Sequence, residues 1–324
     1  MILVGDIGAT KTRVGYYSIK NDFLNIHQTE TYVSKDFANL EEVIGVFIKK
    51  YHMPVDSACF GVPGPVIDGY VKTTNLPWEI GEDQIARLLS VAKVKLVNDL
   101  EATAAAIPYL SAQKIMVLHK GQKASAQELY VILAPGTGLG VGLLYRNASF
   151  QTTFASEGGH SDFAPNNDLE IQLLKYLQKK YNHVSCERVL TGSGLVNIYQ
   201  FLKESGLHEE PPELAKKLEI GDPAAFISAA AQDKSFEICV KALDIFTSIL
   251  GSLAGNFALT LLPRAIYLGG GIPPKICKKL GDGSILKSYL NKGRMSEIVA
   301  QTPLIVIRDD YAALLGAASI ASNL

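Results

Sequence analysis

Cysteine is scarce in this sequence, and the spacing of its cysteines excludes the usual structural roles of thiols. Among 324 residues there are four: Cys59, Cys186, Cys239 and Cys277. Because no two lie within a few residues of each other, the Cys-x-x-Cys spacing of zinc sites and redox motifs is absent. Separate thiols in a reducing compartment remain, so we expect a cytoplasmic protein.

The sequence also lacks any run of basic residues. Its 31 Lys and Arg residues balance 32 Asp and Glu residues, which leaves a formal net charge of −1. A nucleic-acid-binding surface needs clustered positive charge, so nucleic acid is not an expected partner. Hydrophobic residues make up 48% of the chain, which is enough for large apolar cores. At about 100–150 residues per domain, the length predicts two domains.

Segments that resemble membrane anchors are nearly absent. The start of the chain has neither the basic region nor the long apolar stretch of a signal peptide. Residues 245–262 are uncharged, contain Gly251-x-x-x-Gly255, and are long enough to cross a bilayer. They are diluted by polar side chains, namely Thr247, Ser248, Ser252, Asn256 and Thr260. We expect a buried helix here and no membrane association.

Strand-like and helix-like segments alternate along the chain, which predicts an α/β fold. Apolar runs bounded by turn residues predict strands at 2–4, 12–19, 26–33, 57–62, 94–97, 129–134, 141–145, 265–268 and 304–307. Helical spacing of apolar residues predicts helices at 39–51, 80–90, 101–107, 169–181, 194–204, 212–218, 312–321 and along 223–262. Asn39 is the expected N-cap of the first helix.

Two stretches of the sequence have the same predicted arrangement of strands and turn. The segments LVGDIGATKTRVGYY and VILAPGTGLGVGLLYR each contain an apolar strand, a turn with Gly and Thr, and a second strand bearing Val-Gly. Each lies near the start of one half of the chain, so we expect two similar α/β units that present equivalent turns to each other. The expected small domain is 1–110 plus about 301–324, and the expected large domain is 111–300.

Glycine-rich turns follow three of the predicted strands. Glycines let backbone N–H groups approach a phosphate closely, and threonine adds a hydroxyl donor. Each turn alone fits an ordinary hairpin or loop equally well, but ligands collect at the carboxyl ends of strands in α/β sheets. The first turn comprises Gly5, Asp6, Ile7, Gly8, Ala9 and Thr10, the second Gly136, Thr137 and Gly138, and the third Gly269, Gly270 and Gly271.

The first turn is not a Walker A loop, because the Gly-x-x-x-x-Gly-Lys-Ser/Thr pattern is absent. It does contain a carboxylate, and Asp6 can hold Mg²⁺, most simply through water, since Mg²⁺ dehydrates reluctantly.

Polar residues stand at three further turns. Asn98 and Asp99 follow a predicted strand, where Asp99 either points into a cleft or caps the next helix. Glu157 and His160 flank Gly-Gly and can hydrogen-bond neighbouring hydroxyl groups, or can belong to an exposed turn. Glu187 precedes Arg188, with which a surface ion pair is the plain alternative.

Taken together, these segments resemble the bacterial glucokinase family, within the superfamily of actin-like ATPases, hexokinases and heat-shock ATPases. The resemblance covers almost the whole chain in the family's order. It includes VGDIGATKTRVGYY, VNDLEATAAAIP, GTGLGVGLLY, SEGGHSDFAP, SCERVLTGSGLVNIY, GNFALTLL and LGGGIPP. It implies two actin-like (ribonuclease H-like) α/β domains separated by a cleft, and transfer of the γ-phosphoryl group of ATP to the 6-hydroxyl of glucose.

The resemblance also implies roles for single residues. Asp99 corresponds to the catalytic base, and the glucose-binding set is Asn98, Asp99, Glu157, His160 and Glu187. The three turns correspond to the first phosphate, second phosphate and adenosine loops, with Mg²⁺ as the accompanying ion. Members of the family are usually cytoplasmic homodimers, so glucose, ATP and a second copy of the chain are the expected partners.

The sequence departs from the family's usual pattern in places. Ala9 stands where the family has a second glycine, Lys11 where a small polar residue is common, and Pro135 where glycine is frequent. The zinc motif of the related repressor-and-kinase group is missing. Two alternatives stay open: a kinase for mannose or an amino sugar, and a non-catalytic sugar sensor. A sensor would be favoured by a DNA-binding segment before the first strand, and none is expected.

Overall fold

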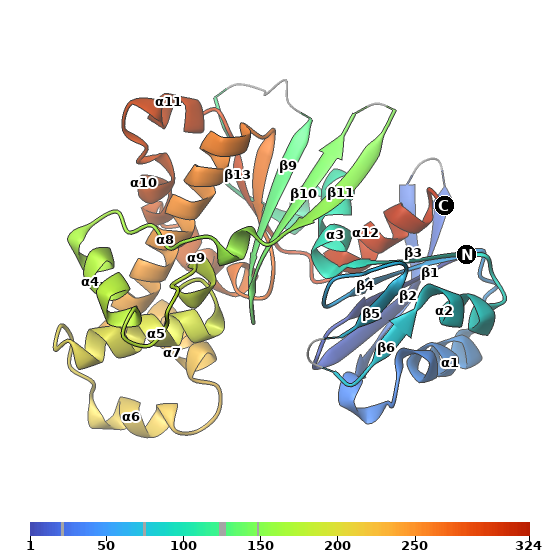
Figure 1. Ribbon diagram of the computed structural model, residues 1–324, viewed down its shortest axis with the longest axis horizontal. Coiled ribbons are helices and arrows are strands. Elements are labelled where there is room, and N and C mark those ends of the chain that lie inside the picture. Colours follow the sequence, from blue (N-terminus) through green and yellow to red (C-terminus); the bar gives the residue numbers. More distant parts are fainter. Residues whose placement is uncertain (21–22, 74–75, 123–127, 148) are drawn as a thin grey trace.

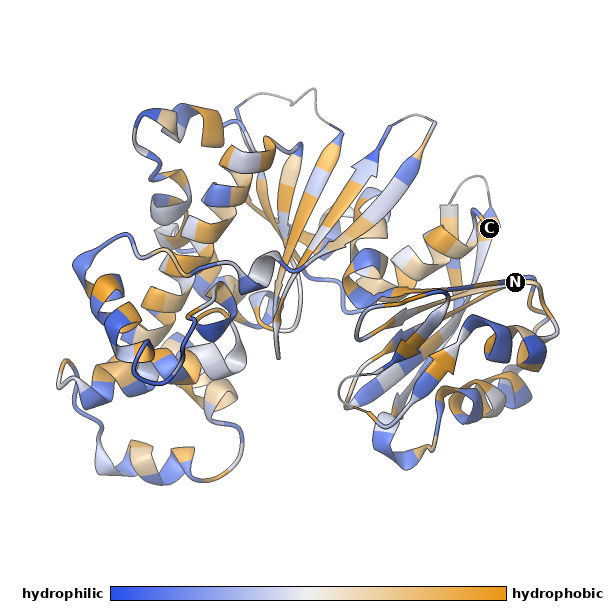
Figure 2. Cartoon of the chain, viewed as in Figure 1, coloured by the Kyte–Doolittle hydropathy of each residue, from blue (hydrophilic) through white to orange (hydrophobic). Residues whose placement is uncertain are grey.

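The protein forms two α/β units that lie next to each other, as the computed structural model shows (Figure 1). The structure describes all residues except 21–22, 74–75, 123–127 and 148. Apolar residues are concentrated along the strands of both sheets and along the apolar helices α8 (Glu237–Leu261) and α12 (Ala312–Ala321) (Figure 2).

The first unit is built on a five-stranded sheet in the order β3-β2-β1-β4-β7. β1, β2 and β3 are antiparallel, whereas β4 and β7 run parallel to β1. The strands are β1 (Ile2–Ile7), β2 (Lys11–Lys20), β3 (Phe23–Val33), β4 (Ser57–Val62) and β7 (Lys93–Asn98). A short hairpin, β5 (Tyr70–Lys72) and β6 (Glu79–Gly81), lies beside it.

Both faces of this sheet are buried, which explains why its central strands are apolar throughout rather than alternating. Helices α1 (Leu40–Tyr51) and α2 (Glu82–Leu89) cover the face that bears Leu3 and Phe60. The opposite face, with Val4 and Cys59, packs against α12 (Ala312–Ala321). The expected N-cap of α1 is confirmed, because the side chain of Asn39 accepts a hydrogen bond from the backbone N–H of Glu42.

The second unit repeats the same strand order and adds one strand at its edge. Its order is β11-β10-β9-β12-β13-β8, with β9, β10 and β11 antiparallel and β12 and β13 parallel to β9. The two stretches with the same predicted arrangement therefore occupy equivalent places in two similar sheets. The strands are β8 (Ile115–His119), β9 (Leu129–Pro135), β10 (Leu139–Arg146), β11 (Gln151–Ser156), β12 (Ala265–Leu268) and β13 (Leu304–Ile307).

Helices form most of the second unit beyond its sheet. They are α4 (Asp168–Leu177), α5 (Gly192–Glu204), α6 (Pro212–Leu218), α7 (Pro223–Gln232), α8 (Glu237–Leu261), α9 (Cys277–Leu280), α10 (Ser284–Leu290) and α11 (Ser296–Val299). The helical stretch expected over 223–262 is two helices, because Lys234 adopts a positive φ of 56° between them.

Helix α8 is long and apolar enough to cross a membrane, but 78% of its most apolar window is buried inside the protein. Gly251 and Gly255 face helix α10, and a Cβ at either position would overlap the backbone of Ile285 or Tyr289. The Gly-x-x-x-Gly pattern thus permits close packing of two helices within the core, as expected from the sequence.

The last strand of the chain belongs to the second unit and the last helix packs on the first unit, which corrects one expectation. We expected residues from about 301 onwards to return to the first unit, but β13 hydrogen-bonds to β12 and β8 in the second sheet. Only α12 packs on the first sheet. It also crosses α3 (Asp99–Ala105) so closely that a Cβ at Gly316 would overlap the carbonyl oxygen of Ala102. The pair α3 and α12 lies between the sheets (Figure 1).

Candidate active site

A cavity of about 400 Å³ lies where the carboxyl ends of strands from both sheets meet. Asp6 stands near the end of β1, Asp99 directly follows β7, and the third glycine-rich turn, 269–271, directly follows β12. This is the place where open α/β sheets bind ligands. The full lining is Asp6, Arg13, Asp99, Leu100, Thr103, Gly269, Gly270, Gly271, Pro274, Lys275, Ile307, Asp309, Asp310, Ala312 and Ala313.

Asp99 is available for chemistry because its neighbour caps the helix. The Asn98 side chain accepts a hydrogen bond from the N–H of Leu100 at 3.0 Å, and Glu101 accepts one from the N–H of Asn98 at 3.1 Å. This capping box starts α3 at Asp99, two residues before the expected start at 101. Capping by Asp99, the alternative that the sequence left open, is not what the structure shows.

The environment of Asp99 favours its neutral form. Burial, and secondarily the negative charge of Asp6, raise the pKa of Asp99 to about 6, although the backbone N–H of Leu100 acts in the opposite direction. A carboxylate with a raised pKa is a stronger base than an ordinary aspartate, yet it is still ionised at neutral pH.

Asp6 lies opposite Arg13 across the β1–β2 ladder. A guanidinium nitrogen of Arg13 is 3.3 Å from Oδ2 of Asp6. Burial raises the pKa of Asp6, and the charge of Arg13 reduces this effect. Within the part of the chain that the structure describes, no group of three or more His, Cys, Asp or Glu residues can surround a metal. A single carboxylate facing a cavity still suits Mg²⁺, which usually combines one or two carboxylates with water and substrate phosphates.

The other residues of the first turn do not line this cavity in the structure. Gly5 packs against the ring of Phe60, and Ile7 is buried in the core of the first unit. Gly8 is held by two bonds: its N–H donates to the carbonyl oxygen of Lys11 at 3.0 Å, and its own carbonyl accepts from Ser34 Oγ at 2.7 Å. Ala9 and Thr10 form the exposed tip of the turn.

The second and third turns lie side by side, and a hydrogen bond joins the residues that flank them. The N–H of Gly136 donates to the carbonyl oxygen of Gly138 at 2.8 Å, which closes the second turn. The carbonyl of Pro135 accepts from the N–H of Ile272 at 3.1 Å. Gly270 needs to be glycine, because its φ is +76° and an added Cβ would lie 2.8 Å from that same carbonyl. A proline is therefore compatible with position 135, because the contact with the third turn uses the carbonyl oxygen and not the N–H that proline lacks.

These two turns border a second pocket of about 710 Å³, which was not predicted from the sequence. The amino-terminal part of α5 and one side of α7 along its whole length form the other walls, and the positive end of α5 favours negative charge. The segment LTGSGL carried the available signal, since a capping Thr191 followed by Gly-Ser-Gly marks a helix start without side chains to block a ligand. The lining is Gly136, Thr137, Gly192, Ser193, Leu195, Val196, Asp222, Pro223, Ala224, Ala225, Ser228, Ala229, Gln232, Gly271, Ile272 and Lys275.

Glu157, His160 and Glu187 gather on the second unit. Nε2 of His160 lies 3.9 Å from Oε2 of Glu157 and 3.9 Å from Oε2 of Glu187. Glu187 is fixed by the N–H of Leu139, which donates to its Oε2 at 3.0 Å. The Glu157 side chain is 92% exposed, so it is free to meet a ligand.

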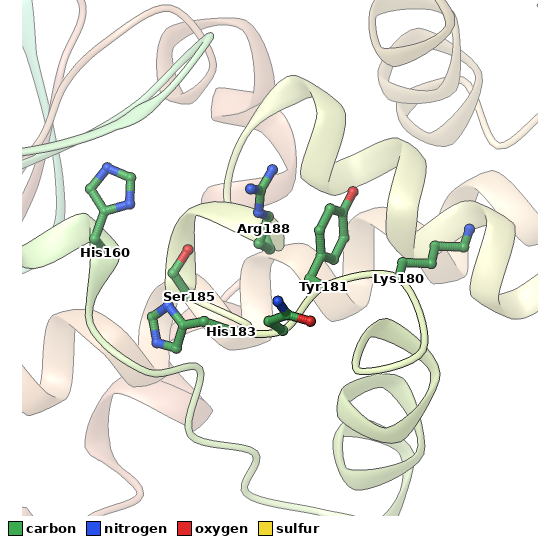
Figure 3. A pocket seen from close by; sticks show the side chains of 7 residues that line it. His160, Lys180, Tyr181, His183, Ser185 and Arg188 are labelled. Carbon is green, nitrogen blue, oxygen red and sulfur yellow. The ribbon is translucent and has the colours of Figure 1, made fainter.

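The ion pair between Glu187 and Arg188, the alternative considered from the sequence, does not form among the described residues. The guanidinium of Arg188 lies over the ring of Tyr181, 4.3 Å from its centroid. It lines a third pocket of about 380 Å³, in which His160 and Lys180 stand at opposite edges with Arg188 and Tyr181 between them (Figure 3).

The sugar-binding candidates form two sets, Asn98 with Asp99 and Glu157 with His160 and Glu187, and the start of β10 lies between them. Leu139 holds Glu187, and the next residue, Gly140, is so close to Leu100 that a Cβ would overlap its side chain. Leu100 adjoins Asp99, so one strand end positions both sets. Asn98 ends β7 and Asp99 begins α3, both in the first unit, whereas Glu157, His160 and Glu187 belong to the second unit. No hydrogen bond joins the two sets within the described ranges.

Comparisons with known proteins show the family to which the chain belongs. A family model described as glucokinase matches residues 3–324. A glucokinase of Nostoc sp. is 38% identical over 342 residues, covering 100% of this chain and 99% of that protein. A glucokinase of Photorhabdus laumondii is 33% identical over 97% of this chain and 94% of its own length.

Solved structures give the same result. A glucokinase from an Antarctic psychrotroph superimposes with a TM-score of 0.87 at 30% identity, covering 100% of this chain and 99% of that chain. A glucokinase of Balamuthia mandrillaris in complex with glucose has a TM-score of 0.78 at 22% identity, covering 99% of this chain and 93% of that chain, and supports the fold. The expected two-domain actin-like architecture is confirmed. The chain belongs to the glucokinase family, and its reaction is the ATP-dependent phosphorylation of glucose.

Proposed function

We propose that Asp99 is the base of this reaction. The observation that carries the proposal is the position of Asp99, which lines the interdomain cavity together with Asp6 and the third turn. Its pKa, raised to about 6, suits proton acceptance near neutral pH. The neighbouring Asn98 supports Asp99 from the side, because its side chain caps the helix and also donates a 3.3 Å bond to the carbonyl of Gly64, which fixes its orientation.

The step follows from this placement. The 6-hydroxyl oxygen of glucose attacks the γ-phosphorus of ATP in line as its proton moves to a carboxylate oxygen of Asp99. The bond from the γ-phosphorus to the bridging oxygen breaks, and that oxygen leaves with ADP. A positioned base contributes on the order of 10²–10⁴ to the rate, and positioning with charge neutralisation supplies most of the rest.

Asp6 is our proposed holder of Mg²⁺, through water. Bound there with ATP, the ion would neutralise negative charge on the phosphoryl oxygens. The charge of Arg13, 3.3 Å from Asp6, opposes the rise in the pKa of Asp6 that burial causes, and so favours the ionised form that a metal ligand needs.

Sugar binding is assigned to Glu157, His160 and Glu187 on the second unit and to Asn98 and Asp99 on the first. Carboxylates accept hydrogen bonds from sugar hydroxyls, and imidazole can donate or accept. Because one Glu187 oxygen is already bonded to Leu139, that carboxylate is held in a fixed orientation. Since the candidates lie on two units, approach of the units around the sugar would complete the site and exclude water.

The nucleotide is assigned to the 710 Å³ pocket, with the second turn and the start of α5 near its phosphates. Further proposals concern the whole molecule. The small domain is 1–110 together with α12, the large domain contains the remainder including β13, and the enzyme works as a homodimer in the cytoplasm. The family resemblance supports the dimer and the compartment.

A coupled assay with purified protein, Mg-ATP and a panel of sugars tests the proposal. We expect strong turnover of glucose and weak turnover of mannose, fructose, galactose and N-acetylglucosamine. Preferred turnover of mannose or an amino sugar would keep the mechanism but contradict the assignment of the sugar-binding residues. An Asp99→Ala variant with wild-type kcat would remove Asp99 from the role of base.

A further inference from the structure

Two cavities described above meet at a shared wall. The 710 Å³ pocket on the second unit and the 400 Å³ cavity around Asp6 and Asp99 are lined in common by Gly271 and Lys275. A nucleotide whose adenosine lies in the 710 Å³ pocket and whose γ-phosphoryl group reaches Asp99 in the 400 Å³ cavity must pass along the lining that the two share. The phosphate chain therefore passes beside these two residues.

The backbone at Lys275 is held firmly against the second turn. Residues Pro273–Ile276 form a 3-10 turn, in which the N–H of Lys275 donates to the carbonyl oxygen of Ile272 at 3.0 Å. Ile272 in turn donates to Pro135 at 3.1 Å, and Ile276 is fully buried. Only the side chain of Lys275 is exposed. A fixed backbone with a free, long side chain places an ammonium group within reach of both cavities.

The charges of the smaller cavity leave Lys275 as its available cation. Arg13 is paired with Asp6, and Asp309 is paired with Lys114 at 3.4 Å. Lys275 forms no ion pair with any residue that the structure describes. Asp99 and Asp310 add further negative charge to the same lining. A polyphosphate entering this space needs positive charge, and a lysine ammonium is a compact point charge suited to phosphate.

We propose that Lys275 binds the phosphate chain of the nucleotide where the chain passes from the adenosine pocket to the cavity of Asp6 and Asp99. The proposal rests on the assignment of the 710 Å³ pocket to adenosine. It adds a cationic ligand to a site in which the glycine-rich turns contribute backbone donors.

The test compares Lys275→Met with Lys278→Met, which removes another exposed lysine three residues further on in α9. Binding of ATP, ADP and adenosine is measured by calorimetry, and KM for ATP and for glucose by the coupled assay. Because a charge-assisted bond is lost, Lys275→Met should weaken ATP and ADP binding about 10- to 100-fold. Adenosine binding and KM for glucose should stay within twofold, and Lys275→Arg should restore much of the affinity for ATP.

Two results would overturn the proposal. One is ATP binding by Lys275→Met within twofold of wild type. The other is an equal loss of affinity for adenosine and for ATP, which would show that the substitution disturbs the pocket rather than removing a phosphate ligand. Because the calorimetric comparison needs no turnover, it tests Lys275 even if wild-type protein fails to phosphorylate glucose, an outcome that would count against the proposed function instead.

Discussion

Replacing Asp99 with asparagine removes a partly buried charge while keeping the size and shape of the side chain. In the wild-type protein this charge is unfavourable, because burial and the charge of Asp6 raise the pKa of Asp99 from its ordinary value of 3.8 to about 6. The Asp99→Asn variant should therefore be more stable than wild type and nearly inactive. The two effects have one cause, which is a carboxylate kept in an environment that suits its neutral form.

The magnitude and sign follow from proton linkage. A group with a raised pKa in the folded state contributes stability below its unfolded pKa, and this contribution is lost as pH rises through the folded pKa. For Asp99 the loss occurs between about pH 3.8 and pH 6. Each pKa unit corresponds to 1.36 kcal/mol, so above pH 6 the ionised form costs as much as about 3 kcal/mol. Asparagine, which stays neutral, avoids that cost.

The assay is thermal unfolding of both proteins from pH 4 to pH 8, without nucleotide or divalent cation. For a unit of this size about 1 kcal/mol corresponds to roughly 2–4 °C in Tm, so we expect the variant to gain several degrees at pH 8 and little at pH 4. Asp36→Asn, at an exposed aspartate outside the cavity, is the matched control and should change Tm equally little at both pH values. The kcat of Asp99→Asn should fall at least about 10²-fold.

Unchanged or lower stability of Asp99→Asn at pH 8 would refute the reasoning about burial. An increase of the same size at pH 4 and pH 8 would also refute it, because a gain that ignores pH cannot come from removing a titrating charge. A stable variant with wild-type kcat would leave the electrostatics intact and exclude Asp99 as the base.

Three further predictions follow from the site. The kcat/KM of the wild type should fall tenfold per pH unit below about pH 6, where Asp99 becomes protonated; a flat profile down to pH 5 in a stable protein would contradict this. Glu157→Ala should raise KM for glucose at least about tenfold without changing Tm, since the side chain is 92% exposed; an unchanged KM would place Glu157 outside the sugar site. Gly270→Ala should destabilise the protein by on the order of 1–3 kcal/mol and raise KM for ATP, because φ is +76° and the Cβ would meet the Pro135 carbonyl. Gly271→Ala is the control for stability, because a Cβ at Gly271 would meet no other atom. Equal losses of stability in the two variants would contradict the argument from the positive φ of Gly270.

Much of the local structure was predictable because its causes are local. The strand Ser57–Val62 and the helix Pro212–Leu218 have the bounds expected from the sequence, since a continuous apolar run and a proline at a helix start act within a few residues. The Asn39 cap is a bond to a residue three positions away. The three glycine-rich turns do follow strands, as expected, because glycine at a strand end is a signal in the sequence itself, but of the first turn only Asp6 lines the cavity.

The edge strands β8 and β11 were missed, and their burial explains why. Their side chains are half-buried or exposed along most of their length, so they lack the apolar runs of the central strands. They are strands because β13 and β10 offer them free hydrogen-bonding edges. Pairing with a partner far along the chain, rather than the sequence of either strand, determines their conformation.

Tertiary structure alone decided how the candidate residues meet. The sequence indicated a carboxylate at Asp99, but only the crossing of α3 and α12 at Gly316 and the packing of Leu100 on Gly140 set it in a cavity shared by both units. The same holds for the pocket formed by α5 and α7 and for the position of Lys275 between two cavities. Sequence patterns record what a residue needs from its near neighbours, whereas cavities and pKa shifts depend on atoms brought together from distant parts of the chain.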